Sequence, residues 1–201
     1  MAEPSRGLQI SRRGWLMAGL AVPLFRAWGA DLIVTFDGDN LHISSLGVHF
    51  LNGKPLDRLK AGSTVWWLAR ITLFRDAYLT PWRHTDARFE LSYDVLGEDQ
   101  FKVNMPGPPQ RSALNLSQDA AEAWCLDRLW IPTTGLMPDR NFWLQLELGP
   151  VPQKDLSSIL GENSIRIDFI DVFSRPGADP PVIKQAGPLR LADLVRTGRG
   201  R

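Results

Sequence analysis

The feature that most constrains the fold of this chain is an alternation of apolar and polar residues with a period of two. In Arg88–Leu96, Phe89, Leu91, Tyr93 and Val95 alternate with the polar residues Arg88, Glu90, Ser92 and Asp94. Because side chains on a β-strand point alternately to opposite faces, this pattern predicts a half-buried strand. In Thr64–Phe74 both faces are largely apolar, which predicts a central strand that is covered on both sides.

Similar segments recur at a spacing typical of hairpins. They are Leu32–Phe36, Leu41–Ser44, Val48–Phe50, Gln100–Asn104, Arg128–Pro132, Asn141–Leu148 and Ser164–Phe173. Helical signal is sparse: Ser117 is a good N-cap residue ahead of helix formers, and shorter turns are predicted at Pro55–Leu59 and Leu189–Arg196. The chain is therefore predicted to be all-β, an antiparallel β-sandwich of about eight strands with one or two short accessory helices.

Residues 1–29 have the composition of an export signal. Arginines precede the uncharged run Trp15–Phe25, and small residues flank a cleavage position. The cleavage residues are Ala27, Gly29 and Ala30, with Ala30 as the expected mature N-terminus. The uncharged run is shorter than the roughly 20 residues that cross a bilayer. We therefore expect a cleaved leader, no permanent membrane span, and a periplasmic or otherwise extracytoplasmic protein.

The start of the leader, Ser11-Arg12-Arg13-x-Trp15-Leu16, resembles the bacterial twin-arginine signal. Trp15 stands where that signal has Phe, and Met17 stands where it has Lys, so the general secretion route stays open as an alternative. The resemblance implies transient contact with the twin-arginine export machinery and transport of the folded chain.

Composition limits the partners of the mature chain. Removing residues 1–29 leaves 19 basic and 21 acidic residues, without the clustered positive charge that binds a phosphate backbone. Nucleic acid is therefore not an expected partner. Residues 30–175 are predicted to form one β-sandwich domain, and residues 176–201 a Pro/Gly-rich linker with a C-terminal helix or tail. The single cysteine, Cys125, is expected to be a buried apolar residue.

Three short segments resemble a family of uncharacterised, exported bacterial proteins that is known only as a domain of unknown function. Leu59–Gly62 is a Leu-x-x-Gly turn that leads into the strand Val65–Arg75, Phe89–Asp94 is a second strand, and Trp124–Leu129 passes from helix to strand. The resemblance covers about residues 40–150. It implies no activity, cofactor or catalytic residue.

No group of residues has the spacing of a metal or cofactor site. The three histidines, His42, His49 and His84, lack the i, i+2 or i, i+4 spacing that aims two imidazoles at one ion. Asp37–Asn40 resembles part of a calcium loop but lacks the later acidic ligands, so a hairpin turn explains it better. Nucleophile-elbow and phosphate-loop motifs are missing too. We expect no metal, no cofactor and no catalytic residue.

Pairs of carboxylates leave one enzymatic alternative open. Glu90 and Asp94 share a strand face, and Glu147 meets Asp168 if their strands pair. Glycoside hydrolysis needs two carboxyl groups roughly 5–10 Å apart, so either pair is a candidate for a carbohydrate-active enzyme. Alternating charges along a strand are more often its solvent-facing side.

Tryptophan is the unusual component, with eight in the chain. Two leave with the leader, and because Trp66 and Trp67 point to opposite faces of one strand, at least one is expected in the core. Trp82 lies in a predicted loop, and Trp143 lies on the polar face of its strand. Exposed aromatic side chains suit carbohydrate stacking or a protein interface. The alternative is that they cover sheet edges and pack under loops.

The candidate binding surface consists of Trp66, Trp82, Trp143, Arg75 and Arg83. With it, the predicted function is that of a non-catalytic binding or assembly module of the cell envelope. The expected partner is an envelope protein or a glycan.

Overall fold

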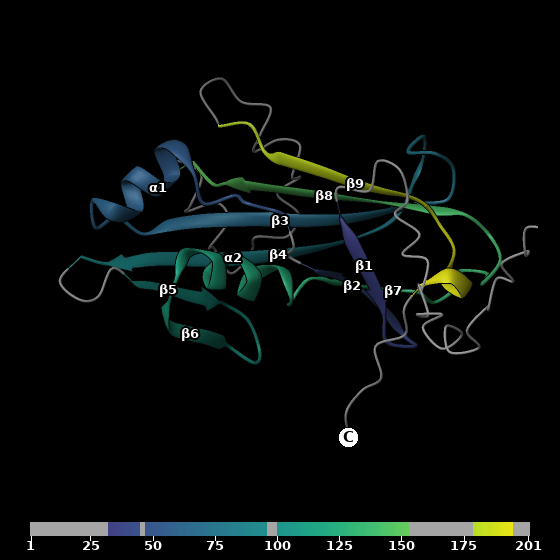
Figure 1. The fold of residues 1–201 in the computed structure, drawn as a ribbon, viewed down its shortest axis with the longest axis horizontal. Helices are drawn as coiled ribbons and strands as arrows, with labels where there is room; N and C mark the ends of the chain where they lie inside the picture. The colour runs from purple at the N-terminus through teal and green to yellow at the C-terminus, as the bar shows by residue number, and fades with distance from the viewer. Residues whose placement is uncertain (1–31, 45–46, 96–99, 153–178, 195–201) are drawn as a thin grey trace, which may run out of the picture.

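The computed structural model describes residues 32–44, 47–95, 100–152 and 179–194 (Figure 1). The predicted leader and the predicted strand at Ser164–Phe173 lie outside these residues. Within them the fold is all-β and sandwich-like, as predicted, with two antiparallel sheets of three and six strands and two short α-helices. No helix in the described ranges has the length and apolarity needed to cross a membrane.

The small sheet has the strand order β1–β2–β7. Its strands are β1 (Ile33–Phe36), β2 (Asn40–Ser44) and β7 (Trp130–Pro132). The turn between β1 and β2 is the predicted hairpin turn, in which Asp37 Oδ1 accepts the N–H groups of Asp39 and Asn40 at 2.9 and 2.7 Å. Asp37 Oδ2 lies 2.9 Å from His42 Nε2. These bonds, led by the one to His42, hold the pKa of Asp37 well below its usual range.

The large sheet has the order β6–β5–β4–β3–β8–β9. Its strands are β3 (Val65–Phe74), β4 (Pro81–Asp94), β5 (Gln100–Met105), β6 (Arg111–Leu116), β8 (Phe142–Pro150) and β9 (Val182–Leu189). The central strand β3 pairs with β4 and β8. Both of its faces are covered, since Trp67 on the inner face is 2% exposed and Leu68 on the outer face is 6% exposed. This confirms the prediction of a doubly covered strand.

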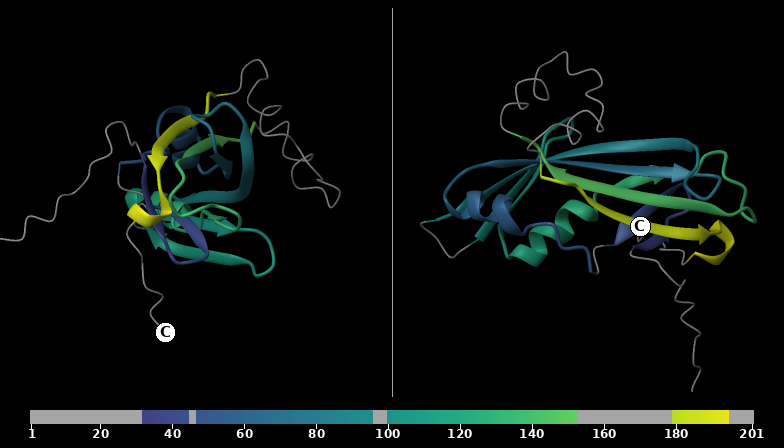
Figure 2. Two further views of the ribbon diagram at one scale, coloured as in Figure 1. Left: turned by 90° about the vertical axis from the view of Figure 1, so that its right-hand side faces the viewer. Right: turned by 90° about the horizontal axis from the view of Figure 1, so that it is seen from above.

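The inner face of the large sheet is covered by two different layers. The helix α1 (Gly53–Lys60) packs on β3 and β4, and α2 (Gln118–Leu126) packs on β5 and β6, while the small sheet contacts β3 and β4 through β7. Both views in Figure 2 place these elements on the same side of the large sheet. The apolar core lies between the layers and includes Cys125, which is fully buried as predicted. Burial raises the pKa of its thiol.

Three sequence predictions differ from the structure. Val182–Leu189 is not part of a linker but the edge strand β9, in which Pro188 is tolerated because an edge strand need not donate on its outer side. Trp82 lies in β4 and not in a loop, because β4 continues along the whole length of β3. Val48–Phe50 is not a strand, since the Phe50 N–H is bonded to the side chain of Glu122 at 2.7 Å.

Candidate functional site

The structure brings three of the predicted surface residues together. The guanidinium carbon of Arg75 lies 3.6 Å from the ring centroid of Trp82, and that of Arg83 lies 5.0 Å from it. Arg75 Nη2 donates to Gly135 O at 3.3 Å, and Arg83 Nη1 donates to Pro132 O at 3.1 Å. The group therefore clamps the β3–β4 hairpin to residues 132–135. We call Arg75, Trp82 and Arg83 the Trp82 clamp.

The close approach in the Trp82 clamp depends on Gly135. This residue has a φ of +85°, and a Cβ there would lie 3.3 Å from Trp82 Cζ2. Only glycine adopts this backbone conformation readily and leaves the ring room. The packing of Trp82 against the core and the hydrogen bonds of both arginines indicate a structural role for the clamp.

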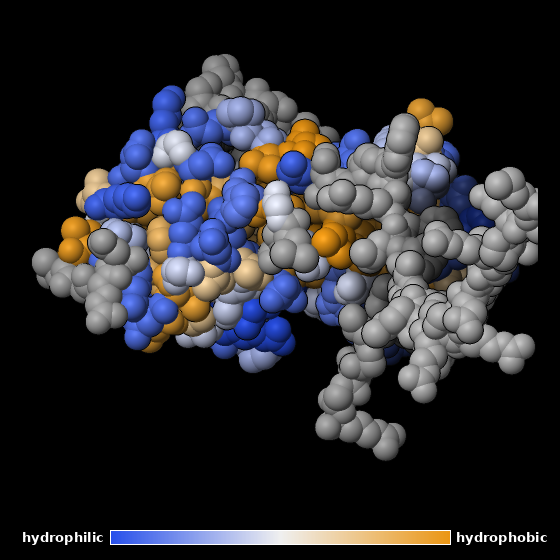
Figure 3. All heavy atoms as spheres, in the orientation of Figure 1, coloured by the Kyte–Doolittle hydropathy of each residue, from blue (hydrophilic) through white to orange (hydrophobic). Residues whose placement is uncertain are grey.

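The other two predicted residues lie elsewhere. Trp143 is on the outer face of the large sheet, with its ring 6.5 Å from that of Tyr78, and a Cβ at Gly187 would collide with its Cδ1 atom. Trp66 is at the start of β3, whereas Trp143 pairs with Phe74 at the end of β3. Eight residues of strand separate these positions by about 26 Å. The five predicted residues do not form one surface. In the view of Figure 3, apolar side chains reach the surface in separate patches among hydrophilic ones.

The structure gives little support to the two carboxylate pairs as sites of glycoside hydrolysis. Glu90 and Asp94 lie four residues apart along β4, so their Cα atoms are separated by about 13 Å, and Glu90 accepts a bond from Asn104 Nδ2 at 2.9 Å. Asp168 lies outside the described residues. Glu147 is opposite Arg70 in the sheet, and burial raises its pKa. The enzymatic alternative stays a prediction.

One buried carboxylate was not anticipated from the sequence. Glu122, on α2, is 2% exposed. Its Oε1 accepts the N–H groups of Phe50 and Leu51 at 2.7 and 2.6 Å, and its Oε2 lies 2.8 Å from His49 Nδ1. The bond to Glu122, reinforced by its charge and by that of Asp119, raises the pKa of His49. We call the Glu122 contacts the Glu122 pin, because they hold residues 49–51 against α2.

The same residues are the described group best suited to a metal ion. Ligand atoms of His49, Asp119 and Glu122 lie within 4.8 Å of one another, in an open depression of about 400 Å³. One imidazole and two carboxylates suit an ion such as Zn²⁺. Both oxygens of Glu122 already have protein partners, however, so the arrangement is electrostatically complete without an ion.

A second depression, of about 200 Å³, lies on the other side of residues 49–55. It is formed where the start of α1 faces the inner surface of β3, β8 and β9. Its walls are mainly apolar: Phe50, Pro55, Trp67, Leu148, Pro150 and Val182. Its polar rim consists of Asn52, Lys54 and Asp179. We call it the indole pocket, after the side chain that distinguishes it.

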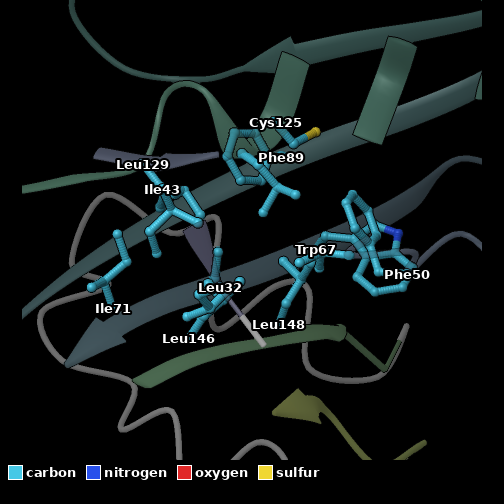
Figure 4. Packing of buried hydrophobic residues seen from close by; sticks show 14 of the residues in the cluster. Leu32, Ile43, Phe50, Trp67, Ile71, Phe89, Cys125, Leu129, Leu146 and Leu148 are labelled. Carbon is cyan, nitrogen blue, oxygen red and sulfur yellow. The ribbon is translucent and has the colours of Figure 1, made fainter. Parts of the chain in front are cut away.

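Trp67 is the only lining residue with a buried polar atom that lacks a partner in the described structure. Its side chain is 2% exposed, and Nε1 has no hydrogen-bond acceptor. The ring packs edge-on against Phe50, with centroids 4.7 Å apart, at one end of the apolar cluster in Figure 4. Arg128 Nε is similarly unpartnered, but that guanidinium also donates from Nη1 to Trp124 O at 2.8 Å. The indole has a single donor, so its whole polar capacity is unmet.

Only some of the residues that line this pocket could be predicted from the sequence. The adjacent pair Trp66 and Trp67 correctly predicted one core tryptophan. Nothing in the local pattern of residues 50–55 indicated that they face Leu148 and Val182, because that contact depends on how distant strands pair. Comparison of the chain with protein-family models, with curated proteins and with solved structures gives no match. The case for function therefore rests on the geometry of the site.

Proposed function

We propose that the protein is an exported, non-catalytic binding module of the cell envelope that holds a small, largely apolar molecule in the indole pocket. The observation that carries the proposal is the pocket itself, a depression of about 200 Å³ with mainly apolar walls, one of which is the side chain of Trp67, and with a polar rim.

The size and lining of the pocket favour an organic ligand. A volume of about 200 Å³ greatly exceeds the ≈ 30 Å³ share of one water molecule in the liquid, and an apolar cavity of about 150 Å³ stays dry and binds benzene. Ligand sites are commonly mostly apolar, with a few polar groups that orient the guest. The indole pocket has this composition.

The cellular part of the proposal comes from the leader. The paired arginines, the uncharged run and the small residues before Ala30 support export. An envelope location brings the module into contact with small molecules and proteins outside the cytoplasm. The rival function of a carbohydrate-active enzyme has no comparable observation among the described residues.

The test uses the mature chain from Ala30, labelled with ¹⁵N at the tryptophan indoles. Trp67→Phe assigns the Trp67 signal, and Trp130→Phe, at a residue that is 45% exposed and does not line the pocket, is the matched control. Small molecules with six-carbon bodies and different head groups are titrated. We expect at least one to shift the Trp67 signal, and to bind the Trp130→Phe variant unchanged and the Trp67→Phe variant more weakly. If no compound moves that signal, the proposed function is wrong.

A further inference from the structure

Two acidic residues lie one helical turn apart near the start of α2. Asp119 and Glu122 are separated by three positions, so their side chains share a face of the helix. The capping bond from the Ala120 N–H to Ser117 Oγ, at 3.2 Å, fixes this first turn. His49 lies opposite, with its Nδ1 2.8 Å from Glu122 Oε2 and 4.0 Å from Asp119 Oδ1. One nitrogen and two carboxylates therefore meet from two separate segments of the chain.

The spacing of these atoms suits the coordination of one ion. Zn–N and Zn–O bonds are about 2.0–2.2 Å long, so tetrahedral geometry places two ligand atoms about 3.4 Å apart. The separations of 2.8 and 4.0 Å from His49 Nδ1 lie on either side of this value, and all three atoms lie within 4.8 Å of one another. The widest gap closes by rotation of Asp119, whose side chain is 85% exposed.

The group is open to solvent although one of its members is buried. All three residues line the depression of about 400 Å³ described above, and the side chain of His49 is 65% exposed. Glu122 is held in place from the inside, because its Oε1 accepts the N–H groups of Phe50 and Leu51. Those two bonds do not involve Oε2. The carboxylate is therefore fixed in position before an ion arrives, and only Oε2 has to change its partner.

The present partner of Glu122 Oε2 is one that an ion can replace. A carboxylate oxygen only accepts, so the proton of this hydrogen bond is on His49 Nδ1. When a metal ion binds, that proton leaves for the solvent, and Nδ1 and Oε2 become ligands. The protein interior thus keeps a positively polarised partner for the buried carboxylate, as a proton in one state and as a metal ion in the other.

The ligand set selects the class of ion. Ca²⁺ takes about six to eight oxygen ligands, and Mg²⁺ prefers oxygen ligands in an octahedral shell. Zn²⁺ binds imidazole and carboxylate together, with three protein ligands and one open position in many sites. We propose that His49, Asp119 and Glu122 bind one divalent transition-metal ion of the Zn²⁺ type, with water in the open position. The site lies on the other side of residues 49–55 from the indole pocket and does not depend on the proposed function.

The test titrates Zn²⁺ into the mature chain, prepared without a histidine tag, and measures binding by calorimetry. We expect one ion per chain, which Mg²⁺ or Ca²⁺ at the same concentration does not displace. Asp119→Asn should weaken Zn²⁺ at least about tenfold, because even the loss of a group that only orients a ligand costs about 10–100-fold. Asp127→Asn, at the exposed C-cap of the same helix, is the matched control and should leave binding unchanged.

The histidine ligand is tested in the same way. His49→Gln should weaken Zn²⁺ by at least the same factor, whereas His84→Gln, at an exposed histidine outside the group, should have no effect. In a chain labelled with ¹⁵N at histidine, Zn²⁺ should shift the Nδ1 signal of His49. If it shifts the Nε2 signal instead, the imidazole binds the ion from its outer side and the three-residue site is wrong. The inference also fails if the chain takes up no Zn²⁺, or if Asp119→Asn or His49→Gln binds it as tightly as the wild type. None of these outcomes bears on the indole pocket.

Discussion

A buried polar group lies on each side of residues 47–55, the carboxylate of Glu122 on one side and the indole N–H of Trp67 on the other. The carboxylate is fully hydrogen-bonded, and the N–H is not. On the α2 side, Glu122 has a protein partner for each of its oxygens, including two backbone N–H groups. On the side of β3, the Trp67 N–H has no acceptor among the described residues. Both side chains are 2% exposed, so burial alone does not separate them.

The comparison separates a carboxylate with a structural role from an indole N–H that makes no hydrogen bond. Glu122 is the acceptor that residues 50 and 51 need, because they have no strand partner. Replacing Trp67 by phenylalanine would remove its N–H without breaking a hydrogen bond. The same contrast appears at the helix starts, where α2 is capped by Ser117 and α1 is not capped by Asn52. The side chain of Trp67 and the start of α1 both line the indole pocket.

The largest expected change in the free energy of unfolding comes from removing the hydrogen-bonded carboxylate of Glu122. Glu122→Ala leaves the N–H groups of Phe50 and Leu51 without an acceptor in the interior, so the free energy of unfolding should fall by roughly 3–5 kcal/mol. Urea unfolding followed by circular dichroism measures this. Asp119→Ala is the matched control on the same helix; its side chain is 85% exposed, so we expect a change within about 0.5 kcal/mol.

A Glu122→Ala chain that does not fold would leave the size of the effect unmeasured, so Glu122→Gln is measured beside it. The amide oxygen still accepts both N–H groups, while the charge is lost and an NH₂ donor replaces the oxygen that faces His49, so a smaller fall of about 1–2 kcal/mol is expected. If the Ala variant is as stable as the wild type, the Glu122 pin does not hold residues 49–51.

The sequence predicted the parts of this arrangement that depend on local pattern. Alternation identified β3 and the second half of β4, and Ser117 marked the start of α2. It did not identify β9, since Gly187 and Pro188 interrupt the pattern of an edge strand. Nor could it pair His49 with Glu122, because they are 73 positions apart and neither lies in a motif.

The candidate surface shows the same limit. Alternation correctly assigned Trp143 to the polar face of its strand, but a face does not specify a position along the sheet. Trp66 and Trp143 are far apart because the register pairs Trp143 with Phe74. Trp82 joined Arg75 and Arg83 because all three lie at one hairpin. The positions of Trp66 and Trp143 relative to these three residues depend on strand register and long-range packing.

A smaller change in the free energy of unfolding is expected when the N–H of Trp67, which has no acceptor, is removed. Trp67→Phe removes a buried donor that has no acceptor, which stabilises the fold. It also removes part of a packed ring, which destabilises the fold. These changes oppose each other, so the free energy of unfolding without ligand should change by less than about 1.5 kcal/mol. Trp67→Ala, measured by the same urea unfolding, should lose about 3–5 kcal/mol because it deletes the whole ring. A loss above 3 kcal/mol for Trp67→Phe would show that the nitrogen has a partner.

The smallest effect concerns the exposed end of the Glu122 pin. Since the pKa of His49 is raised above its ordinary value of 6.5, its protonated form stabilises the fold fully below about pH 6.5, and this contribution is lost as the pH rises through the folded-state pKa. The stability difference between wild type and His49→Gln should therefore be larger at pH 6 than at pH 8.5.

The cause can be isolated by titrating His49 by NMR in the Glu122→Gln variant. Asp119 also faces the ring, with its Oδ1 4.0 Å from His49 Nδ1, but the bond to Glu122 is the larger cause of the raised pKa. Glu122→Gln should therefore return the pKa of His49 most of the way to its ordinary value, and Asp119→Asn should lower it only slightly. A wild-type pKa at or below the ordinary value would mean that Glu122 Oε2 is not bonded to the imidazole in solution. One oxygen of Glu122 would then lack a partner, as the nitrogen of Trp67 does, and the contrast between the two sides of residues 47–55 would disappear.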